Sequence, residues 1–291
     1  MGEREFLERV ARFVELVPLC PRLSLGISLP RESFLLLQRR DSLELLNLRT
    51  RLRVGEELSK FSQKVLPTLD VDGFLTRSES PFCGVLDAKV FDSELRPKER
   101  DDGLFTRWIR KYHPLLPVES HRRLQDYEVR RLFLARLFSL AELRETLGFM
   151  RSERELVEFH RRYKYLLMLH SPQHLKLLGN IVANREERPL EEVKSIYRLI
   201  FMETLAKSPS RRSYANVFLH LYGHMKRRLE EREKELLRQQ IKGYAEGRRG
   251  LRSLFATFLE MLQRQGNAYA LSQRFFQPYP PELEVEETAR A

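Results

Sequence analysis

The helical spacing of apolar residues between residues 156 and 183 is the feature that most constrains how this chain can fold. Its first part places one apolar stripe on a helix, made of Leu156, Phe159, Tyr163, Leu166, Leu167 and His170. Ser171 then offers an N-cap to a second helix, Pro172 suits its first turn, and the apolar spacing continues to Val182. The segment therefore predicts two helices joined by a tight turn.

Composition sets the broad class of the protein. A chain of 291 residues with 42% hydrophobic residues is long enough and apolar enough for two ordinary domains. No apolar run approaches the roughly 18 residues of a membrane helix, and residues 1–13 are charged throughout, unlike a signal peptide. We therefore expect a cytoplasmic protein without a membrane partner. The chain has two cysteines, Cys20 and Cys83, which are too few for a disulfide framework in a chain of this length. They are instead candidates for reactive or metal-binding thiols.

The two halves of the chain show different patterns of secondary structure. Predicted strands and helices alternate in the first half, which favours an α/β layer, whereas helical spacing dominates the second. The sequence therefore predicts a two-domain α+β protein, with an α/β domain over residues 1–148 and an all-α domain over 149–291. The clearest elements are a hairpin of Ser33–Gln38 with Leu43–Leu48, strands at Leu16–Val17 and Asp72–Arg77, and helices at Leu190–Ala206, Tyr214–Ala245 and Leu251–Arg264. Both cysteines are expected in loops beyond strand ends, where ligands collect in such sheets.

The basic charge is concentrated in the second half. Of the formal net charge of +11, residues 1–150 contribute +3 and residues 151–291 contribute +8. Cations neutralise phosphates and tyrosine rings can stack on unpaired bases, so a nucleic acid is the preferred partner. The candidate nucleic-acid-binding residues are Arg161, Arg162, Lys164, Arg211, Arg212, Tyr214, Asn216, Lys226, Arg227 and Arg228, with Tyr163 and Tyr222 interleaved and few acidic residues nearby.

Three segments of the second half resemble the YbgA-type helical domain, across most of Arg151–Leu283. They are F-H-x-x-x-K-x-L-x-x-x-H-S-P from Phe159, NVFLHLYGHMKRRL from Asn216 and PYPPEL from Pro278. The positions that agree with the family pattern are His160, Lys164, His170, Ser171, Asn216 and His220, whereas Tyr163 stands where the family usually has a histidine. That domain often follows an α/β domain similar to bacterial thiouracil and 4-thiouridine desulfidases, where it is thought to hold tRNA. The resemblance implies structured RNA, with tRNA expected, as the partner.

Two short segments of the first half resemble that desulfidase family, across about Glu3–Phe138. Val17–Pro21 and Ser80–Gly84 are similar to two of its three cysteine segments. In the family, three cysteines hold a 4Fe-4S cluster whose free iron takes the sulfur of a thiolated pyrimidine. The resemblance implies that Cys20 and Cys83 are candidate cluster ligands. Ser78 and Ser80 are candidate catalytic residues that could bond a base or a sulfide.

The sequence departs from the desulfidase pattern at several functional positions. The family's first cysteine lies upstream of the start of this sequence, Arg22 stands in place of the glutamate after the second Cys-Pro, Ser24 replaces an acidic residue and Phe82 replaces a serine. Either the chain start is truncated or the catalytic site has been lost, and loss also accounts for Arg22. We therefore expect no cofactor, or a 4Fe-4S cluster if the site is functional.

The interpretation of the whole sequence is an RNA-binding protein, with tRNA as the expected RNA, that is related to iron-sulfur desulfidases and carries a degenerate catalytic site. Whether it is an enzyme stays open. One alternative is an active 4Fe-4S desulfidase that removes sulfur from thiolated pyrimidines. A second alternative is a scaffold that binds another protein.

Overall fold

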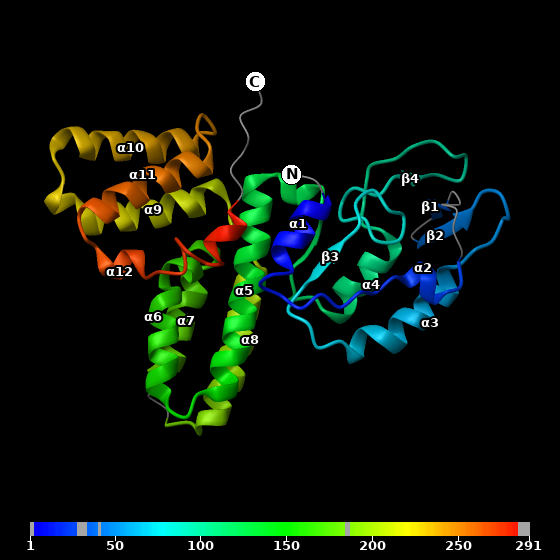
Figure 1. Ribbon diagram of the computed structural model, residues 1–291, viewed down its shortest axis with the longest axis horizontal. Coiled ribbons are helices and arrows are strands. Elements are labelled where there is room, and N and C mark those ends of the chain that lie inside the picture. Colours follow the sequence, from blue (N-terminus) through cyan, green and yellow to red (C-terminus); the bar gives the residue numbers. More distant parts are fainter. Residues whose placement is uncertain (1–2, 28–33, 40–41, 184–186, 285–291) are drawn as a thin grey trace. The chain divides into compact units, whose positions relative to one another are not determined.

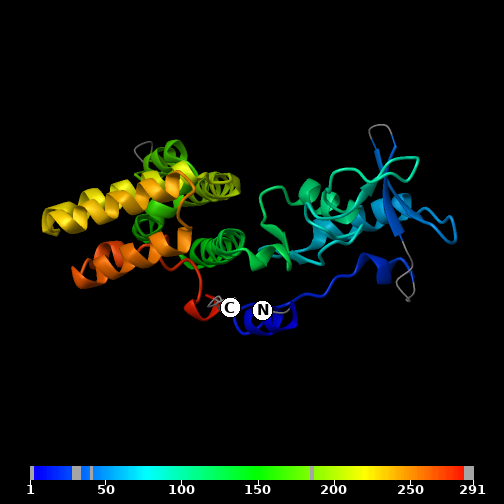
Figure 2. The same ribbon diagram turned by 90° about the horizontal axis from the view of Figure 1, so that it is seen from above.

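The computed structural model describes residues 3–27, 34–39, 42–183 and 187–284, and the chain divides into two compact units, Met1–Phe133 and Leu134–Ala291. Figures 1 and 2 show small sheets and helices in the first unit and helices alone in the second, so the predicted fold class is confirmed. The limit between the units falls inside helix α5 (Tyr127–Phe149), and the boundary predicted after residue 148 falls at the end of that helix.

The N-terminal unit contains two small sheets. Strand β1 (Phe34–Arg39) pairs antiparallel with β2 (Ser42–Asn47) and parallel with β4 (Val90–Phe91). Strand β3 (Phe74–Thr76) pairs parallel with β5 (Val118–Ser120). The predicted hairpin and the predicted strand within Asp72–Arg77 are therefore confirmed, while the hairpin turn at residues 40–41 lies outside the described residues.

The strand predicted at Leu16–Val17 is wrong. These two residues follow helix α1 (Glu3–Val10) as irregular chain, and 47% and 59% of their surfaces are exposed. An apolar pair becomes a strand only where a neighbouring strand supplies hydrogen bonds and a buried face, and this pair has neither. Cys20 consequently does not follow a strand and instead stands at the N-cap of the short helix α2 (Pro21–Ser24).

One apolar core joins the first sheet to the helices of the N-terminal unit. Helix α3 (Gly55–Val65), which runs on into the 3-10 turn η1 (Leu66–Thr68), and helix α4 (Leu104–Tyr112) pack on it, and a second 3-10 turn, η2 (Arg123–Gln125), lies beyond β5. Phe82 belongs to this core, with its ring 5.3 Å from that of Phe34. The buried ring of Phe82 therefore fixes the position of the loop that carries Cys83.

The C-terminal unit is a set of packed helices. Helix α6 packs on α7, α8 and α9, α10 packs on α9, and α11 packs on α10, as Figure 1 shows. No helix in the described part of the chain is long and apolar enough to cross a membrane. The bounds are α6 Glu153–His170, α7 Pro172–Val182, α8 Leu190–Ala206, α9 Arg211–Met225, η3 Lys226–Arg228, α10 Glu231–Ala245, α11 Leu251–Arg264, α12 Ala268–Leu271 and η4 Pro281–Leu283.

Two of the predicted helical segments have different outcomes. The hairpin of α6 and α7 is confirmed, including the cap, because Ser171 Oγ accepts the His174 N–H at 3.2 Å. The single helix predicted over Tyr214–Ala245 is wrong, since the chain leaves α9 through η3 and starts again at Glu230, which forms a capping box with Glu233. The break lets α10 fold back onto α9 and bury its own apolar face, which one continuous helix could not do.

Candidate functional site

The N-terminal candidate site consists of the two thiols and the loop that holds one of them. Cys20 is exposed and Cys83 is partly buried. Burial, together with the nearby Cys20 thiol, raises the pKa of Cys83 to about 12, while the Ser80 hydroxyl, Arg22 and Arg77 oppose the shift. The fold therefore brings the two predicted thiols within electrostatic reach of each other, in a basic surrounding.

The two predicted serines organise the backbone of this loop. Ser80 Oγ accepts the N–H groups of Phe82 and Cys83, each at 3.2 Å. Ser78 Oγ accepts the Arg122 N–H at 2.9 Å and lies 3.2 Å from His121 Nδ1. Both hydroxyls thus have structural partners, and their predicted catalytic role stays a prediction.

Arg22 places a cation where the resemblance implies a carboxylate. Its guanidinium carbon lies 5.8 Å from the centre of the Phe82 ring, and its Nε and Nη2 are buried without a hydrogen-bond partner among the described residues. A carboxylate at this position could move a proton, whereas a guanidinium stays charged at working pH. The group that the resemblance would assign to proton transfer is absent.

The ligand set for a 4Fe-4S cluster can be compared with these side chains. Such a cluster is held by cysteine thiolates, usually in sets of three or four. Among the residues that the structure describes, no group of three or more His, Cys, Asp or Glu side chains could hold a metal ion. The described part of the chain therefore offers two thiols and no further ligand, which does not fit the cluster.

The two thiols are expected to react at very different rates. Iodoacetamide at neutral pH should label Cys20 long before Cys83, because the thiolate is the nucleophile and burial raises the pKa of the Cys83 thiol to about 12. Peptide mass spectrometry over a time course measures both rates in one sample. Fast labelling of Cys83 would show that its thiolate is stabilised and would contradict this description.

In the C-terminal unit, the family-matched residues of α6 and α7 serve the packing of the helices. His160 Nδ1 lies 3.2 Å from the Tyr197 hydroxyl, and the His170 Nδ1–H donates to the Lys207 carbonyl at 2.6 Å. Burial lowers the pKa of both histidines from 6.5 to about 4. Both rings are therefore neutral at pH 7 and hold α6 against its neighbours.

This burial predicts a dependence of stability on pH. The unfolded histidines take up protons near pH 6.5 and the folded ones only near pH 4, so stability should be retained above pH 6.5 and fall as the pH decreases toward 4. His170→Asn keeps an N–H donor for the Lys207 carbonyl and cannot titrate. Urea unfolding at several pH values should show a flatter profile for this variant, and an unchanged profile would contradict the assignment.

The predicted cations of α6 are already engaged. Arg161 pairs with Glu158 at 2.6 Å, and Arg162 pairs with Glu142 at 2.9 Å. Lys164 lies 5.6 Å from the centre of the Tyr165 ring. The expectation that few acids surround these cations is therefore wrong for both arginines. Arg161 pairs with Glu158 of its own helix, whereas the fold brings Glu142 of α5 to Arg162.

The tyrosines predicted to stack on bases lie in the core. Tyr163, Tyr214 and Tyr222 are 0%, 5% and 9% exposed. The Tyr214 ring lies 6.0 Å from that of Tyr244 and 6.4 Å from that of Phe255. The predicted role of Tyr214 in stacking on bases is therefore wrong, since its ring fills an aromatic cluster.

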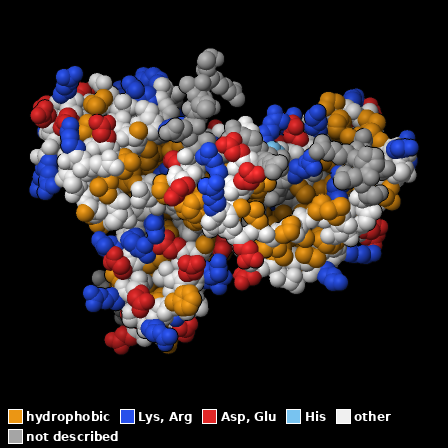
Figure 3. Space-filling view, viewed as in Figure 1, with side chains coloured by type: hydrophobic (Ala, Val, Ile, Leu, Met, Phe, Trp, Pro, Cys, Tyr) orange, Lys and Arg blue, Asp and Glu red, His pale blue; other side chains and the backbone are white. Residues whose placement is uncertain are grey.

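Helix α9 and η3 present an exposed face without acidic residues, which we call the α9 stripe. Spacings of three or four residues place Arg212, Asn216, His220 and Gly223 on one side of α9, and the exposed Lys226, Arg227 and Arg228 of η3 continue the stripe beyond the end of the helix. Arg211 begins the helix but uses its Nη1 to donate to the Tyr244 carbonyl at 3.3 Å. Arg212, Lys226, Arg227 and Arg228 are exposed and form no ion pair with any described residue. Figure 3 shows Lys and Arg side chains extending from the surface of the C-terminal unit, with Asp and Glu side chains among them.

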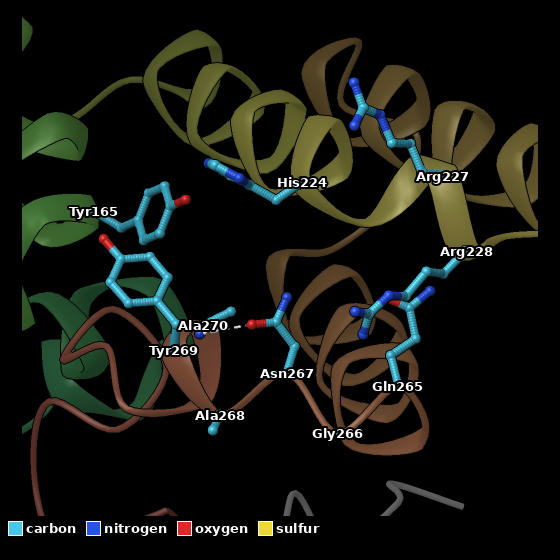
Figure 4. Close-up of a pocket in the computed structure, with 10 residues that line it drawn as sticks. All are labelled: Tyr165, His224, Arg227, Arg228, Gln265, Gly266, Asn267, Ala268, Tyr269 and Ala270. Atoms are coloured by element: carbon cyan, nitrogen blue, oxygen red, sulfur yellow. Dashed lines mark hydrogen bonds between the residues drawn. The ribbon is translucent and has the colours of Figure 1, made fainter.

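A pocket of about 410 Å³ opens where the stripe ends. Figure 4 shows it between the end of α9 with η3 on one side and the turn from α11 to α12 on the other. The lining residues are Tyr165, His224, Arg227, Arg228, Gln265, Gly266, Asn267, Ala268, Tyr269 and Ala270. Only Arg227 and Arg228 were predicted from the sequence. The Gly266-Asn267 pair signals a turn, but no local pattern places that turn opposite η3.

Comparison with known proteins defines the class of the two units. Residues 2–121 match the family model described as 2-thiouracil desulfurase, and residues 164–280 match the model described as protein of unknown function (DUF1722). The chain thus joins an N-terminal 2-thiouracil desulfurase domain to a C-terminal DUF1722 domain, as the two resemblances predicted.

One curated relative is similar to half of the chain. It is the uncharacterized protein YbgA of Escherichia coli (strain K12), which is 25% identical over 148 residues, covering 50% of this chain and 88% of the relative. No solved structure matches the chain.

Proposed function

We propose that this protein binds structured RNA, with tRNA as the expected RNA, and that its desulfurase domain has a degenerate site. The observation that carries the proposal is the α9 stripe, in which Arg212, Lys226, Arg227 and Arg228 are exposed and unpaired within the described part of the chain. A cation that is already paired with a carboxylate gains little from a phosphate, whereas a solvated, unpaired one releases counterions when it meets a polyanion.

The length of the stripe suits a nucleic-acid backbone. Arg212 in α9 and Lys226 at the start of η3 are fourteen positions apart, which corresponds to about 21 Å along the helix axis. Such a distance can span several successive phosphates. Asn216 and His220, which match the family pattern, lie between them and can add hydrogen bonds to phosphate or sugar oxygens.

Degeneracy of the desulfurase site is the second part of the proposal. It is supported by Arg22 in place of a carboxylate and by the two-thiol set of Cys20 and Cys83. Anaerobic reconstitution with iron and sulfide, followed by spectroscopy and an iron count, should give no stable cluster. A stoichiometric 4Fe-4S species would instead favour an active desulfidase.

A single added charge in the stripe tests the proposed RNA contact. Gly223 is exposed, and a Cβ built there meets no atom within 4 Å, so a longer side chain fits. Gly223→Glu should weaken tRNA binding several-fold, because a carboxylate would lie among the cations that meet phosphates. Gly223→Gln is the matched control, with the same shape and no charge.

Both variants should be at least as stable as the wild type, since replacing an exposed helical glycine removes a cost of about 0.5 to 1 kcal/mol. Filter binding measures the affinity and thermal unfolding measures the stability. Equal tRNA affinity for the Glu and Gln variants would show that α9 does not contact the RNA.

A further inference from the structure

The pocket beside the α9 stripe is lined by hydrogen-bond donors, and none of the described residues that line it carries a carboxylate. Arg228 extends from η3 toward Gln265, which with Asn267 comes from the turn after α11, whereas the Arg227 side chain also lines the pocket but points away from these residues in Figure 4. The Asn267 Oδ1 is used by the Ala270 N–H at 3.1 Å, which leaves its amide nitrogen for the pocket, as Figure 4 shows. A site built in this way favours an anionic ligand rich in acceptor oxygens.

Two polar atoms of the lining are buried without a partner in the described part of the chain. They are the hydroxyl of Tyr165 and the Nε2 of Gln265. Tyr165 is 1% exposed, and its hydroxyl points into the pocket in Figure 4. Because buried polar groups in folded proteins are almost always hydrogen-bonded, a polar partner is expected to enter from the open side of the pocket.

An aromatic wall faces these donors. The Tyr165 ring lies edge-on to Tyr269 and to His224, with ring centres 6.4 Å apart in each case. Planar bases bind against such rings, and a pocket of about 410 Å³ is within the range of roughly 300 to 1,000 Å³ that small-molecule sites occupy. The guanidinium of Arg228 at one end and the aromatic rings at the other correspond to the two ends of a nucleotide.

We propose that this pocket holds one unpaired nucleotide of the bound RNA. Its phosphate meets Arg228, its base lies against the accessible rings of Tyr269 and His224, and its polar edge bonds the Tyr165 hydroxyl and the Gln265 amide. The inference rests on the proposed RNA binding, since the pocket lies where the α9 stripe ends. Unpaired nucleotides are the parts of an RNA whose bases can be turned out and bound in this manner.

The test uses the full chain, with variants that separate base contacts from phosphate contacts. Tyr165→Phe removes only the unpartnered hydroxyl, and Gln265→Leu removes the amide at similar size. Each should lower tRNA affinity by roughly two- to tenfold, the effect of one hydrogen bond, without changing the salt slope. Arg228→Ala should lower the affinity and the slope together. Tyr112→Phe, in the N-terminal unit, is the control for a lost tyrosine hydroxyl.

A second arm uses small probes with the same proteins. Nucleoside 5′-monophosphates should give saturation-transfer signals with the wild type and weaker signals with Tyr165→Phe. Inorganic phosphate and unphosphorylated nucleosides should each bind the wild type more weakly than the monophosphates do. Wild-type tRNA affinity for both Tyr165→Phe and Gln265→Leu would overturn the pocket assignment while leaving RNA binding intact. Monophosphate binding without tRNA binding would overturn the assignment to RNA and show a site for a free nucleotide.

Discussion

Replacing Arg212, Lys226, Arg227 and Arg228 together by Ala is expected to lower the affinity of the protein for tRNA by roughly a hundredfold or more at low salt. These four cations are exposed and form no ion pair with any residue that the structure describes. Each one that meets a phosphate contributes roughly 0.7 to 0.9 to the log-log salt slope, so their loss should reduce the slope by about three. Filter binding or fluorescence titration from about 50 to about 200 mM salt measures both quantities.

A matched variant separates these specific contacts from a change in net charge. Four other cations of the same unit are paired with carboxylates on their own helices or turns: Lys194, Lys234, Arg238 and Arg248, with Glu191, Glu231, Glu235 and Glu246. Changing these four to Ala lowers the net charge by the same amount. The slope should then change much less, and an equal loss in both variants would mean that binding is not organised along α9.

Phe218→Ala is expected to have the largest effect on stability, about 3 to 5 kcal/mol. The Phe218 side chain is fully buried in α9, and its ring lies 4.7 Å from Phe258, 5.1 Å from Phe255 and 5.3 Å from Phe275. Truncation would lose the buried apolar area of the ring. It would also leave a cavity, because the surrounding helices are held in place by their other contacts and cannot close around the missing ring.

The control for this substitution is Phe149→Ala at the end of α5. Its side chain is 82% exposed, so its removal should change the free energy of unfolding by no more than about 0.5 kcal/mol. Urea unfolding followed by circular dichroism measures both variants. Similar free energies of unfolding for the two would contradict the described packing of α9 against α11.

Local signals predicted the elements of the fold that depend on local physics. The apolar stripe from Leu156, the Ser171 cap and Pro172 are all read within one or two helical turns, and the α6–α7 hairpin follows from them. The break at residues 226–230 was missed because helical spacing alone continues through it. The turn exists because α10 gains a buried face by packing back on α9, which is a property of the whole unit.

The candidate sites likewise contain residues that sequence signals predict and contacts that only the tertiary fold creates. The resemblance predicted Cys20 and Cys83, and the concentration of basic residues predicted the α9 cations, because both signals can be read in the sequence. The pairing of Arg162 with Glu142 and the burial of Tyr214 could not be predicted, since the partners come from other helices. The pocket residues Tyr165 and Gln265 lie one hundred positions apart in the chain, and only the fold brings them together.

The most direct test of the account is the salt dependence of tRNA binding to the wild-type full chain. With four unpaired cations in the α9 stripe, the logarithm of the association constant should fall with the logarithm of salt concentration with a slope of about minus three or steeper. A folded protein that shows no saturable binding to tRNA at low salt, or binding with a slope near zero, would contradict RNA binding and favour a protein-binding scaffold.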